Sequence, residues 1–528
     1  MSSKTSSPTG GRRSAGAPVL LKLGLAAAPV ETLRAIGDLL RGKRVRGWSG
    51  LNSAASRHPA YYRSWVRHGE PRAITAWLEG AGKGEAALPP VGLVGSPELA
   101  GPGFVSLAPS PARSVLDAAR AHGCEWLLPV PPGWRLSPHL PAILARVPTS
   151  GPQVVYWDHD RLEGARRCHP VLKPAWDPLL QESFDLLTGA AMVRVDAAAA
   201  MAERTGAQDL HDLLVAVALQ GDAAVMHLPL ILSHYQGKGA SAQPRPRPVP
   251  QGNPPGVSVI IPTRDRVDLL GQCLAGLSRL TYDGPVEIII LDNDSREAAS
   301  KAFLARLAES GQCRVEPFPG PFNFAAMMNR GAALASQPML CLLNNDMEMQ
   351  GDDWLAHLVA HAVLPQTGAV GAQLLYPDGT IQHAGVAIGI GGAAGHVAKG
   401  ADPRSPEWLP WHSVTRRVSA VTAACLVVEK SRFLAVGGMD ADRFGVDFND
   451  VDLCLRLQRA GYENRLVAEA SLIHHESKSR GTERVGADRT RFEAELHHLQ
   501  TSWHTLTAQD PWHHPLFRRD SQECLLQF

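Results

Sequence analysis

Three short apolar runs in the second half of the chain are each followed by polar residues and then by a segment with helical periodicity. The runs are VSVIIP at 257–262, VEIIIL at 286–291 and MLCLL at 339–343. Unbroken apolar runs of this length are typical of strands buried on both faces, and helices between them indicate a parallel α/β sheet. The predicted helices cover 267–277, about 297–309 and 352–363.

The predicted strands all end in clusters of polar side chains. Thr263 and Asp265 follow the first strand, Asp292 and Asn293 follow the second, and residues 344–346 (NND) follow the third. In open parallel sheets, ligands bind beyond the carboxyl ends of the strands. We therefore expect these side chains to gather at one edge of the sheet and to form a site.

The third cluster has the composition of a divalent-metal site. Carboxylate and amide oxygens suit a hard cation such as Mg²⁺ or Mn²⁺, and such ions commonly take one or two protein carboxylates together with phosphate oxygens. Asp346 is the best single candidate, with Asn344 or Asn345 assisting. The alternative is that the cluster only ends the strand, because Asn and Asp readily form turns.

A second constellation lies at the start of a predicted helix, in FGVDFNDVDLCLRL (444–457). An acid at the position of Asp450 can serve as a simple helix cap, and that interpretation accounts for one carboxylate. It does not require Asp447, Asp450 and Asp452 together. A carboxylate held here near a nucleotide-sugar could instead deprotonate an attacking hydroxyl.

A third constellation follows a late apolar strand, in ASLIHHESKSRG (470–481). His474 or His475 could complete a metal coordination shell, and Lys478 and Arg480 could meet phosphate charge. Taken alone, paired histidines at a strand end are more often surface polar groups than metal ligands.

Charge and cysteine content narrow the class of protein. The chain has 52 Lys and Arg against 51 Asp and Glu, so no basic field points to nucleic acid as a partner. None of the eight cysteines forms a C-x-x-C pair, which favours a reducing compartment and no zinc knuckle. The first residues lack a signal-peptide pattern, and no window approaches the roughly 20 apolar residues that span a bilayer. These features predict a cytoplasmic protein.

Taken together and in order, these segments resemble the inverting family 2 glycosyltransferases of the GT-A fold. Within that family they are most similar to the bacterial rhamnosyltransferase-like enzymes of O-antigen and other surface-polysaccharide biosynthesis. The resemblance runs from about 256 to 482 and is specific, because eight segments occur in one order. They are VSVIIPTRDR, IIILDNDS, PFNFAAMMNRGA, LLNNDMEM, LLYPDGTIQHAGVAIG, VSAVTAACLVV, FNDVDLCLRL and HHESKSRG.

The resemblance implies a role for each matching position. Asp450 would be the general base. Asp346 and His474, with Asn344, would hold a divalent metal, Mg or Mn. The implied nucleotide- and donor-binding residues are Thr263, Asp265, Asp292, Asn293, Asn323, Asn329, Arg330, Asn345, Lys478 and Arg480, and the implied sugar and acceptor pocket consists of His383, Thr422 and Asp452.

Two positions depart from the family pattern. The metal segment carries Asn where many members have Asp, which lowers the local negative charge and puts the strength of metal binding in doubt. The base segment reads Asn449-Asp450 where Glu-Asp is common. Similar rhamnosyltransferase-like enzymes also carry NDVD segments, so neither change indicates an inactive enzyme.

The resemblance implies a metal-assisted single displacement that inverts the anomeric carbon. The donor would be a UDP- or dTDP-linked sugar, with rhamnose as the first candidate, and the acceptor hydroxyl would belong to a growing surface glycan. A lipid-linked acceptor would bring the protein to the inner face of the cytoplasmic membrane. Peripheral association with the membrane or with other polysaccharide-assembly proteins would follow.

The first half of the chain resembles a degenerate second copy of the same domain. CEWLLPVPPGWRLSPHLPAILARV has the strand-then-helix layout of 338–363, but PVPP at 129–132 replaces the acids at the strand tip. We therefore do not expect a metal site here, despite the DHD sequence at 158–160, and a structural, acceptor-binding or partner-binding role stays open. The expected organisation is a disordered N-terminus (1–20), a helical region (21–89), a degenerate GT-A-like domain (90–236), a Pro-rich linker (237–256), the catalytic GT-A domain (257–482) and a helical C-terminal extension (483–528).

Three alternatives stay open. A sugar-nucleotidyltransferase also binds nucleotides on a parallel α/β sheet, but PTRDR (262–266) lacks the Gly-rich G-x-G-x-R element of that class. A non-catalytic scaffold built from two GT-A-like domains would bind a glycan or a partner, although the retained Asp346, Asp450 and His474 count against it. A metal hydrolase would need an activated water and would act without an acceptor.

Overall fold

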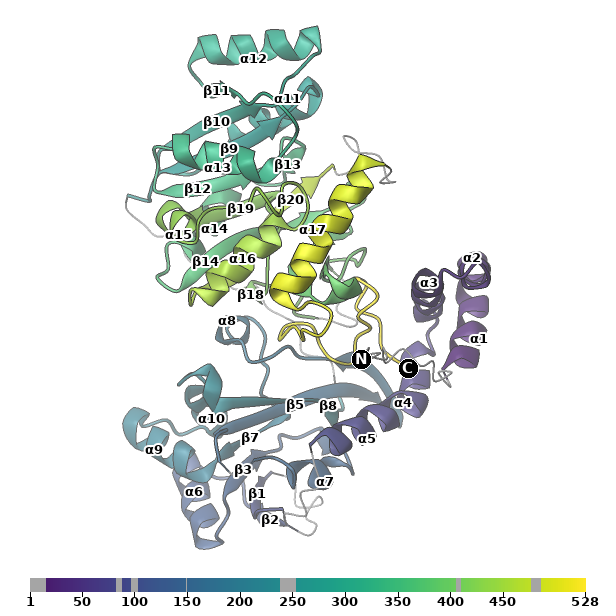
Figure 1. Ribbon diagram of the computed structural model, residues 1–528. Helices are drawn as coiled ribbons and strands as arrows, with labels where there is room; N and C mark the ends of the chain where they lie inside the picture. Colours follow the sequence, from purple (N-terminus) through teal and green to yellow (C-terminus); the bar gives the residue numbers. More distant parts are fainter. Residues whose placement is uncertain are drawn as a thin grey trace, which may run out of the picture.

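The structure is a computed structural model of the chain, and it contains two α/β domains with a small group of helices beside them (Figure 1). No helix in the described residues is long and apolar enough to span a membrane. The structure describes residues 16–81, 88–95, 103–148, 150–237, 253–404, 410–475 and 486–528.

The C-terminal half is built around a ten-stranded mixed sheet with the main strand order β11-β10-β9-β12-β19-β14-β20-β13. Along β9, Val259 and Ile261 pack in one apolar cluster and Ile260 packs in another, so both faces of the strand are covered. The strands are β9 (Val257–Thr263), β10 (Val286–Asp292), β11 (Arg314–Pro317), β12 (Met339–Leu343), β13 (Met347–Met349), β14 (Thr367–Leu375), β15 (Ile381–His383), β18 (Arg416–Val418), β19 (Cys425–Glu429) and β20 (Glu463–His474).

The helices of this half connect the strands as the apolar pattern predicted. The predicted strands correspond to β9, β10 and β12, and the predicted helices to α11, α12 and α14, with ends that differ by at most two residues. A small hairpin, β16 (Val386–Ile388) and β17 (Ala394–His396), lies outside the main sheet. The helices are α11 (Val267–Leu277), α12 (Ala298–Ser310), α13 (Phe324–Leu334), α14 (Trp354–Ala362), α15 (Lys430–Ala435), α16 (Asn449–Arg459) and α17 (Ala487–Trp503).

The first half repeats this topology. Its eight-stranded sheet has the order β2-β1-β3-β7-β5-β8-β4, with β6 beside β5. Each of its pairings has a counterpart of the same direction in the order β10-β9-β12-β19-β14-β20-β13, with β15 beside β14; counterparts of β11 and β18 are missing from its described residues. The predicted degenerate GT-A-like fold is therefore confirmed. Its elements are β1 (Val91–Val94), β2 (Phe104–Leu107), α6 (Ala112–Ala121), β3 (Trp126–Pro129), β4 (Trp134–Leu136), α7 (Leu140–Leu144), β5 (Val154–Glu163), β6 (Arg166–Val171), α8 (Pro178–Gln181), β7 (Ala191–Arg194), α9 (Val195–Thr205), α10 (Leu210–Ala218) and β8 (Val225–Tyr235).

In the part of the chain that the structure describes, five helices precede the first sheet, and the first of them begins inside the segment that we expected to be disordered. On α4, the hydroxyl of Tyr62 donates to Asp160 at 2.6 Å, and the indole of Trp65 donates to the carbonyl of Gln527 at 2.8 Å. This aromatic helix therefore joins the helical group to the first sheet and to the C-terminal tail. The helices are α1 (Ala17–Ala27), α2 (Pro29–Leu40), α3 (Arg44–Ser56), α4 (Tyr61–His68) and α5 (Glu70–Gly80).

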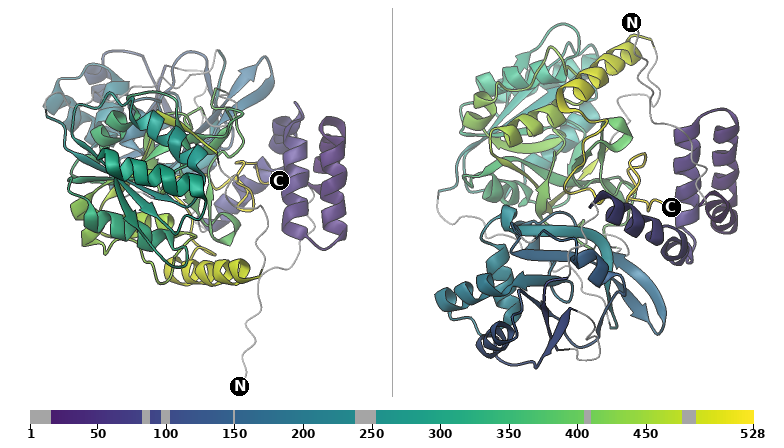
Figure 2. Two further views of the ribbon diagram at one scale, coloured as in Figure 1. Left: turned by 90° about the horizontal axis from the view of Figure 1, so that it is seen from above. Right: turned by 60° about the horizontal axis from the view of Figure 1, so that its bottom comes forward.

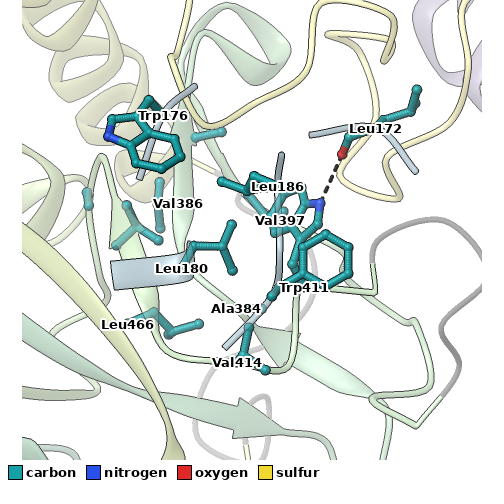
Figure 3. Close-up of a cluster of buried hydrophobic side chains, with 14 of the residues drawn as sticks. Leu172, Trp176, Leu180, Leu186, Ala384, Val386, Val397, Trp411, Val414 and Leu466 are labelled. Atoms are coloured by element: carbon teal, nitrogen blue, oxygen red, sulfur yellow. Dashed lines mark hydrogen bonds between the residues drawn. The ribbon is translucent and has the colours of Figure 1, made fainter. Parts of the chain in front are cut away.

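The two sheets are joined by a buried apolar interface (Figure 3). Trp176 of the first half packs in the same cluster as Trp411 of the second, and the Trp411 indole donates to the carbonyl of Leu172 at 2.9 Å. A polar link lies nearby, because the backbone N–H of Arg417 donates to the Asp177 carboxylate at 2.7 Å. Buried, packed contacts of this kind hold two domains in one relative orientation.

The C-terminal extension is helical only in its first part. After α17, residues 504–528 are mainly irregular and run back to the first half, where the His514 imidazole lies 2.7 Å from Asp158. Asn52 of α3 donates to the carbonyl of Leu526 at 3.0 Å. The expectation of a helix throughout was wrong for this tail, because prolines at 511 and 515 cannot continue a helix.

Candidate active site

A pocket of about 250 Å³ opens at the carboxyl ends of β9 and β12. It brings the polar ends of these two strands together at one edge of the sheet, where parallel sheets bind ligands. The predicted site residues in its wall are Thr263, Asn344, Asn345 and Asp346, and the wall also contains Arg264 and Arg266 and the apolar Pro262, Leu269, Phe322 and Phe324.

Asp346 and His474 meet because β13 pairs with β20. The two strands are antiparallel with Met347 opposite His474, which places the residue before Met347 beside the end of β20. The Asp346 Oδ1 atom lies 3.1 Å from His474 Nε2, and both residues are buried. Side chains alternate along a strand, and the neighbouring His475 instead pairs with Glu348 at 2.7 Å. The histidine at the site is therefore His474.

A glutamine side chain is the hydrogen-bond partner of His474 Nδ1. The Oε1 atom of Gln382 on β15 lies 2.7 Å from His474 Nδ1. An amide oxygen only accepts hydrogen bonds, so Nδ1 carries a proton, and in the neutral form of the ring Nε2 has a lone pair for a metal ion. His474 Nε2 faces Asp346 Oδ1, and Asn344 Nδ2 lies 3.4 Å from His474 Nε2. Sequence analysis missed Gln382, although it stands beside His383 in the segment IQHAG.

These groups fit a divalent cation. A carboxylate oxygen and an imidazole lone pair face each other, and the second nitrogen of the imidazole is held by a hydrogen bond, as is usual for a metal-binding histidine. Two protein ligands leave most of the coordination shell to phosphate oxygens and water, which is how Mg²⁺ and Mn²⁺ are commonly held beside a nucleotide. Asp346 and His474 are therefore the residues that could hold such an ion.

A second group of candidate ligands shows the opposite protonation pattern. The potential ligand atoms of Asp158, His227 and His514 lie within 4.8 Å of one another. The backbone N–H of Leu516 donates to His514 Nδ1 at 3.1 Å, so the proton of this ring sits on Nε2 and is donated to Asp158 at 2.7 Å. Although burial raises the pKa of Asp158, His514 and His227 lower it below its ordinary value. We interpret this group as a buried hydrogen-bonded link between the first domain and the tail.

Asp450 lies at the N-terminus of α16, half-buried. Its two carboxylate oxygens accept hydrogen bonds from the backbone N–H groups of Ala423, at 3.0 Å, and Val451, at 2.8 Å. Desolvation raises the pKa of this carboxyl, and these two bonds together with one from the Thr422 side chain partly oppose the rise. Phe448, which precedes the helix, has a positive φ of 62°, a conformation rare for a bulky residue.

One short segment connects Asp450 to the Asp346 cluster. The backbone N–H of Asn344 donates to the carbonyl of Ala424 at 2.9 Å, and the neighbouring Ala423 donates to Asp450. Asp450 and the backbone of Asn344 are thus bonded to adjacent residues of the segment 422–424, where β19 begins beside the end of β12. This arrangement places an acid with a raised pKa next to the candidate cation site.

Two further histidines lie beside this segment. The backbone N–H of Thr422 donates to His383 Nε2 at 3.5 Å, and His383 Nδ1 lies 2.8 Å from His396 Nδ1. Burial lowers the pKa of His383 well below its ordinary value and lowers the pKa of His396 to about 3. Both rings are therefore neutral near pH 7 and add no positive charge beside the candidate cation site. His396 was not singled out from the sequence.

Of the predicted nucleotide-contacting residues of the first two strands, Thr263 lines the pocket, whereas Asp265 and Asp292 bond to the turns that follow the strands. The Asn345 amide donates to Thr263 Oγ1 at 3.0 Å. Asp265 Oδ1 accepts two backbone hydrogen bonds from the residues before α12, at 2.7 and 2.8 Å. Asp292 accepts one from the backbone of Ser295 at 3.0 Å. These bonds order the turns that follow β9 and β10.

Four predicted donor-binding residues use their side chains elsewhere in the structure. Asn293 is buried, and its amide donates to two carbonyls of the loop before α13. Asn323 caps α13 and donates to the carbonyl of Ala441, and Asn329 bonds to both backbone groups of Met439. Arg330 is exposed and lies in the range of an ion pair with a glutamate of β11, at 3.8 Å. These asparagines therefore hold loops around the pocket.

Asp452 of the predicted acceptor pocket is also engaged. One of its oxygens pairs with Arg456 at 2.8 Å and the other accepts from the Trp503 indole at 2.9 Å, which ties α16 to α17. From the sequence, an acid on the first turn of a helix looks the same whether it faces a pocket or a neighbouring helix. The predicted Lys478 and Arg480 lie outside the described residues.

Comparison with known proteins decides the family of the C-terminal half. Residues 258–406 match Glycosyl transferase family 2. The chain contains a family 2 glycosyltransferase domain. Its sheet order, with the pocket at the ends of β9 and β12, is the predicted GT-A fold, and that expectation is confirmed.

Three known proteins are similar in sequence to this chain. The uncharacterized protein y4gI of Sinorhizobium fredii is 33% identical over 419 residues, which cover 71% of this chain and 46% of that protein. The O-antigen biosynthesis protein RfbC of Myxococcus xanthus is 32% identical over 66% of this chain and 31% of its own length. The N-acetylglucosaminyl-diphospho-decaprenol L-rhamnosyltransferase of Mycobacterium tuberculosis is 27% identical over 40% of this chain and 73% of its own length. The chain thus spans less than half the length of the first two relatives.

Proposed function

We propose that this protein transfers a sugar from a nucleoside-diphosphate sugar to a hydroxyl group of a growing surface glycan, with inversion at the anomeric carbon. The observation that carries the proposal is the arrangement of two acids around one segment. Asp346 faces His474 Nε2, and the half-buried Asp450 accepts a hydrogen bond from Ala423, next to the residue that bonds to the backbone of Asn344. A nucleotide-sugar transfer needs a site for diphosphate charge next to a base, and these residues supply both.

The donor would occupy the pocket at the ends of β9 and β12. Thr263, Asp265 and Asp292 lie at strand ends where a nucleobase and ribose can bind, and Arg264 and Arg266 in the wall can pair with phosphate oxygens. Asp346 and His474 would hold Mg²⁺ or Mn²⁺. A divalent ion bound there supplies positive charge that stabilises the departing nucleoside diphosphate.

Asp450 would act as the general base. Burial raises its pKa, which makes it a stronger proton acceptor than an exposed aspartate. Its position at the start of α16, half-buried, leaves it accessible to an acceptor hydroxyl. The proton moves from that hydroxyl to Asp450 as the oxygen attacks, and no covalent sugar–enzyme bond is required.

The substrate class follows from the relatives and stays part of the proposal. One relative is named for O-antigen biosynthesis and another for rhamnosyl transfer to a diphospho-decaprenol-linked sugar. A UDP- or dTDP-linked donor, with rhamnose as the first candidate, and a lipid-linked glycan acceptor fit those names. Work on such an acceptor would place the protein on the cytoplasmic side of the membrane, in peripheral association with the membrane or with other polysaccharide-assembly proteins.

The direct test measures release of nucleoside diphosphate from a panel of UDP- and dTDP-sugars. Each donor is assayed with Mn²⁺, with and without a lipid-linked glycan fraction extracted from membranes of the source cell. We expect release that depends on the acceptor, and a product whose anomeric configuration, read by proton NMR, is opposite to that of the donor. Equal release with and without acceptor would favour a hydrolase, and no release from any donor would favour a scaffold.

A further inference from the structure

A large groove separates the N-terminal helices from the glycosyltransferase domain. Its volume is about 1230 Å³, beyond the roughly 300–1,000 Å³ of pockets that hold a drug-sized ligand. Its lining comes from α3, from the glycosyltransferase domain around the β16–β17 hairpin, and from the C-terminal tail at 520–525. In Figures 1 and 2, α3 stands beside the domain and the yellow tail runs between them.

The α3 wall presents a row of small hydroxyl groups. Ser49, Ser53 and Ser56 line the groove, and residues three or four positions apart share one face of a helix. All three are half-buried, and Ser56 donates to the carbonyl of Ser53. Among the described residues, no side-chain hydrogen bond is donated by Ser49 or Ser53. Two hydroxyls are thus available to a ligand in the groove.

The opposite wall presents aromatic rings. Lys399 stacks over the Tyr376 ring at 5.7 Å, and Phe448 and Phe492 lie with ring centroids 5.6 Å apart. All four residues line the groove. Aromatic faces combined with hydroxyl and amide groups match a ligand that has apolar C–H faces and hydroxyl edges, as a sugar does.

The charges around the groove nearly cancel. Arg57 and Lys399 supply two positive charges, and Asp402, Asp520 and Glu523 supply three negative ones. Three of these groups already pair with an opposite charge on a neighbouring residue. A balanced, partly neutralised lining does not select a polyanion, so the groove suits an uncharged ligand.

The groove also approaches the candidate base. Phe448, in its lining, directly precedes α16, and Asp450 lies in the first turn of that helix. The donor pocket at β9 and β12 is separate and much smaller, at about 250 Å³. A ligand that extends past Phe448 would approach the start of α16, where the proposed reaction requires the attacking hydroxyl.

We propose that this groove binds the acceptor as an uncharged oligosaccharide of several units, with α3 forming one of its walls. The inference rests on the proposed transferase function and deepens it. It assigns the N-terminal helices an acceptor-binding role, in which Ser49 and Ser53 bond to sugar hydroxyls and Tyr376 contacts a sugar face. The glycosyltransferase domain alone would then bind the donor and lack half of its acceptor site.

The test uses the full chain and saturation-transfer NMR with three uncharged pentasaccharides, built of L-rhamnose, of D-mannose and of N-acetyl-D-glucosamine. Ser53→Trp fills the groove from the α3 side. Arg44→Trp is the matched control, because it lies nine residues earlier and so on the opposite face of the same helix. Tyr376→Ala, on the other wall, replaces Ser53→Trp if that variant fails to fold by circular dichroism.

We expect at least one pentasaccharide to bind wild type and Arg44→Trp, and binding to Ser53→Trp or Tyr376→Ala to weaken at least about tenfold. Binding of no pentasaccharide, or equal binding by wild type and the groove variants, would overturn the inference. Calorimetry of nucleotide with Mn²⁺ on the same proteins keeps the two proposals apart. Loss of sugar binding with intact nucleotide binding concerns the groove alone, whereas a wild type that binds no nucleotide contradicts the proposed transferase function.

Discussion

The two halves of the molecule share a strand order and differ at the ends of their strands. In the second half, β12 is followed by NND at 344–346; in the first half, β3 is followed by VPPG at 130–133. Met347 lies opposite His474 in the β13–β20 pair, whereas Trp134 lies opposite Tyr235 in the corresponding β4–β8 pair. The candidate cation-binding groups of one half are therefore replaced by groups without that chemistry in the other.

The helix that carries the candidate base shows the same difference. Asp450 stands eleven residues before Gly461, and the residue eleven positions before Gly221 in the corresponding helix α10 is Leu210. The apolar residues that build each core are kept in both halves, while the few polar positions at the strand and helix ends are kept in one. Topology is thus set by many buried side chains, and chemistry is set by few.

The largest effect is expected from the two helix positions. Asp450→Asn should lower the rate of transfer by about 10²–10⁴-fold, because a positioned base contributes that much. Leu210→Asn, at the corresponding position of the first half, should leave the rate unchanged. Initial rates of nucleoside diphosphate release, with nucleotide binding as a check on folding, compare the variants. Equal rates for wild type and Asp450→Asn would end the distinction between the halves.

A second prediction concerns the interface that joins the halves. Trp411→Ala should lower the free energy of unfolding by about 3–5 kcal/mol, because it removes a buried indole from the interdomain cluster. The half-buried Trp77 on α5 lies outside that cluster, and Trp77→Ala should cost clearly less. Urea unfolding followed by far-UV circular dichroism measures both. An unchanged midpoint for Trp411→Ala would mean that the halves do not stabilise each other.

A third prediction concerns the residue behind His474. Gln382→Leu should weaken metal-dependent nucleotide binding by about 10–100-fold, because the histidine loses the acceptor that fixes its proton on Nδ1. Gln382→Glu keeps an oxygen acceptor at that position and should retain most of the binding. Calorimetric titrations of nucleotide at several Mn²⁺ concentrations separate the two variants. Similar affinities for both would show that the hydrogen bond does not tune the site.

The smallest expected effect is on the pH profile. Transfer needs Asp450 deprotonated, so the rate should fall as the pH drops through its pKa, which burial places above the ordinary value of 3.8. Thr422→Ala removes a hydrogen bond that lowers this pKa, so the acid limb of kcat/KM should move to higher pH. Profiles of kcat/KM for wild type and Thr422→Ala, measured from about pH 4 to about pH 8, show this shift. A shift to lower pH would contradict the assigned role.

The fold was largely predictable because its signals are local. The apolar runs of β9, β10 and β12 and the helical spacing after them depend on neighbouring residues, and they fix where each element lies. Residues 504–528 were the exception, since their irregular path is held by contacts with the first domain. A sequence does not reveal such distant partners.

The candidate site was predictable only in its composition. Segments rich in polar residues contain Asp346, Asp450 and His474. In contrast, Gln382 and His396 reach the site through strand pairings that their neighbours in the sequence do not predict. Amides posed the converse problem. In the sequence, Asn293 follows an apolar strand just as Asn345 does, but it is buried and its amide donates to loop carbonyls.

The proposed role of Asp346 is to help to bind a metal-bound nucleotide at the end of β12. Its most direct test is a calorimetric titration of UDP, dTDP and GDP, each with Mn²⁺ and with EDTA, into wild type and Asp346→Ala. We predict that one nucleotide binds wild type with Mn²⁺, loses affinity in EDTA, and fails to bind the folded variant. Failure of every nucleotide to bind folded wild type, or binding that neither EDTA nor Asp346→Ala changes, would contradict the claim.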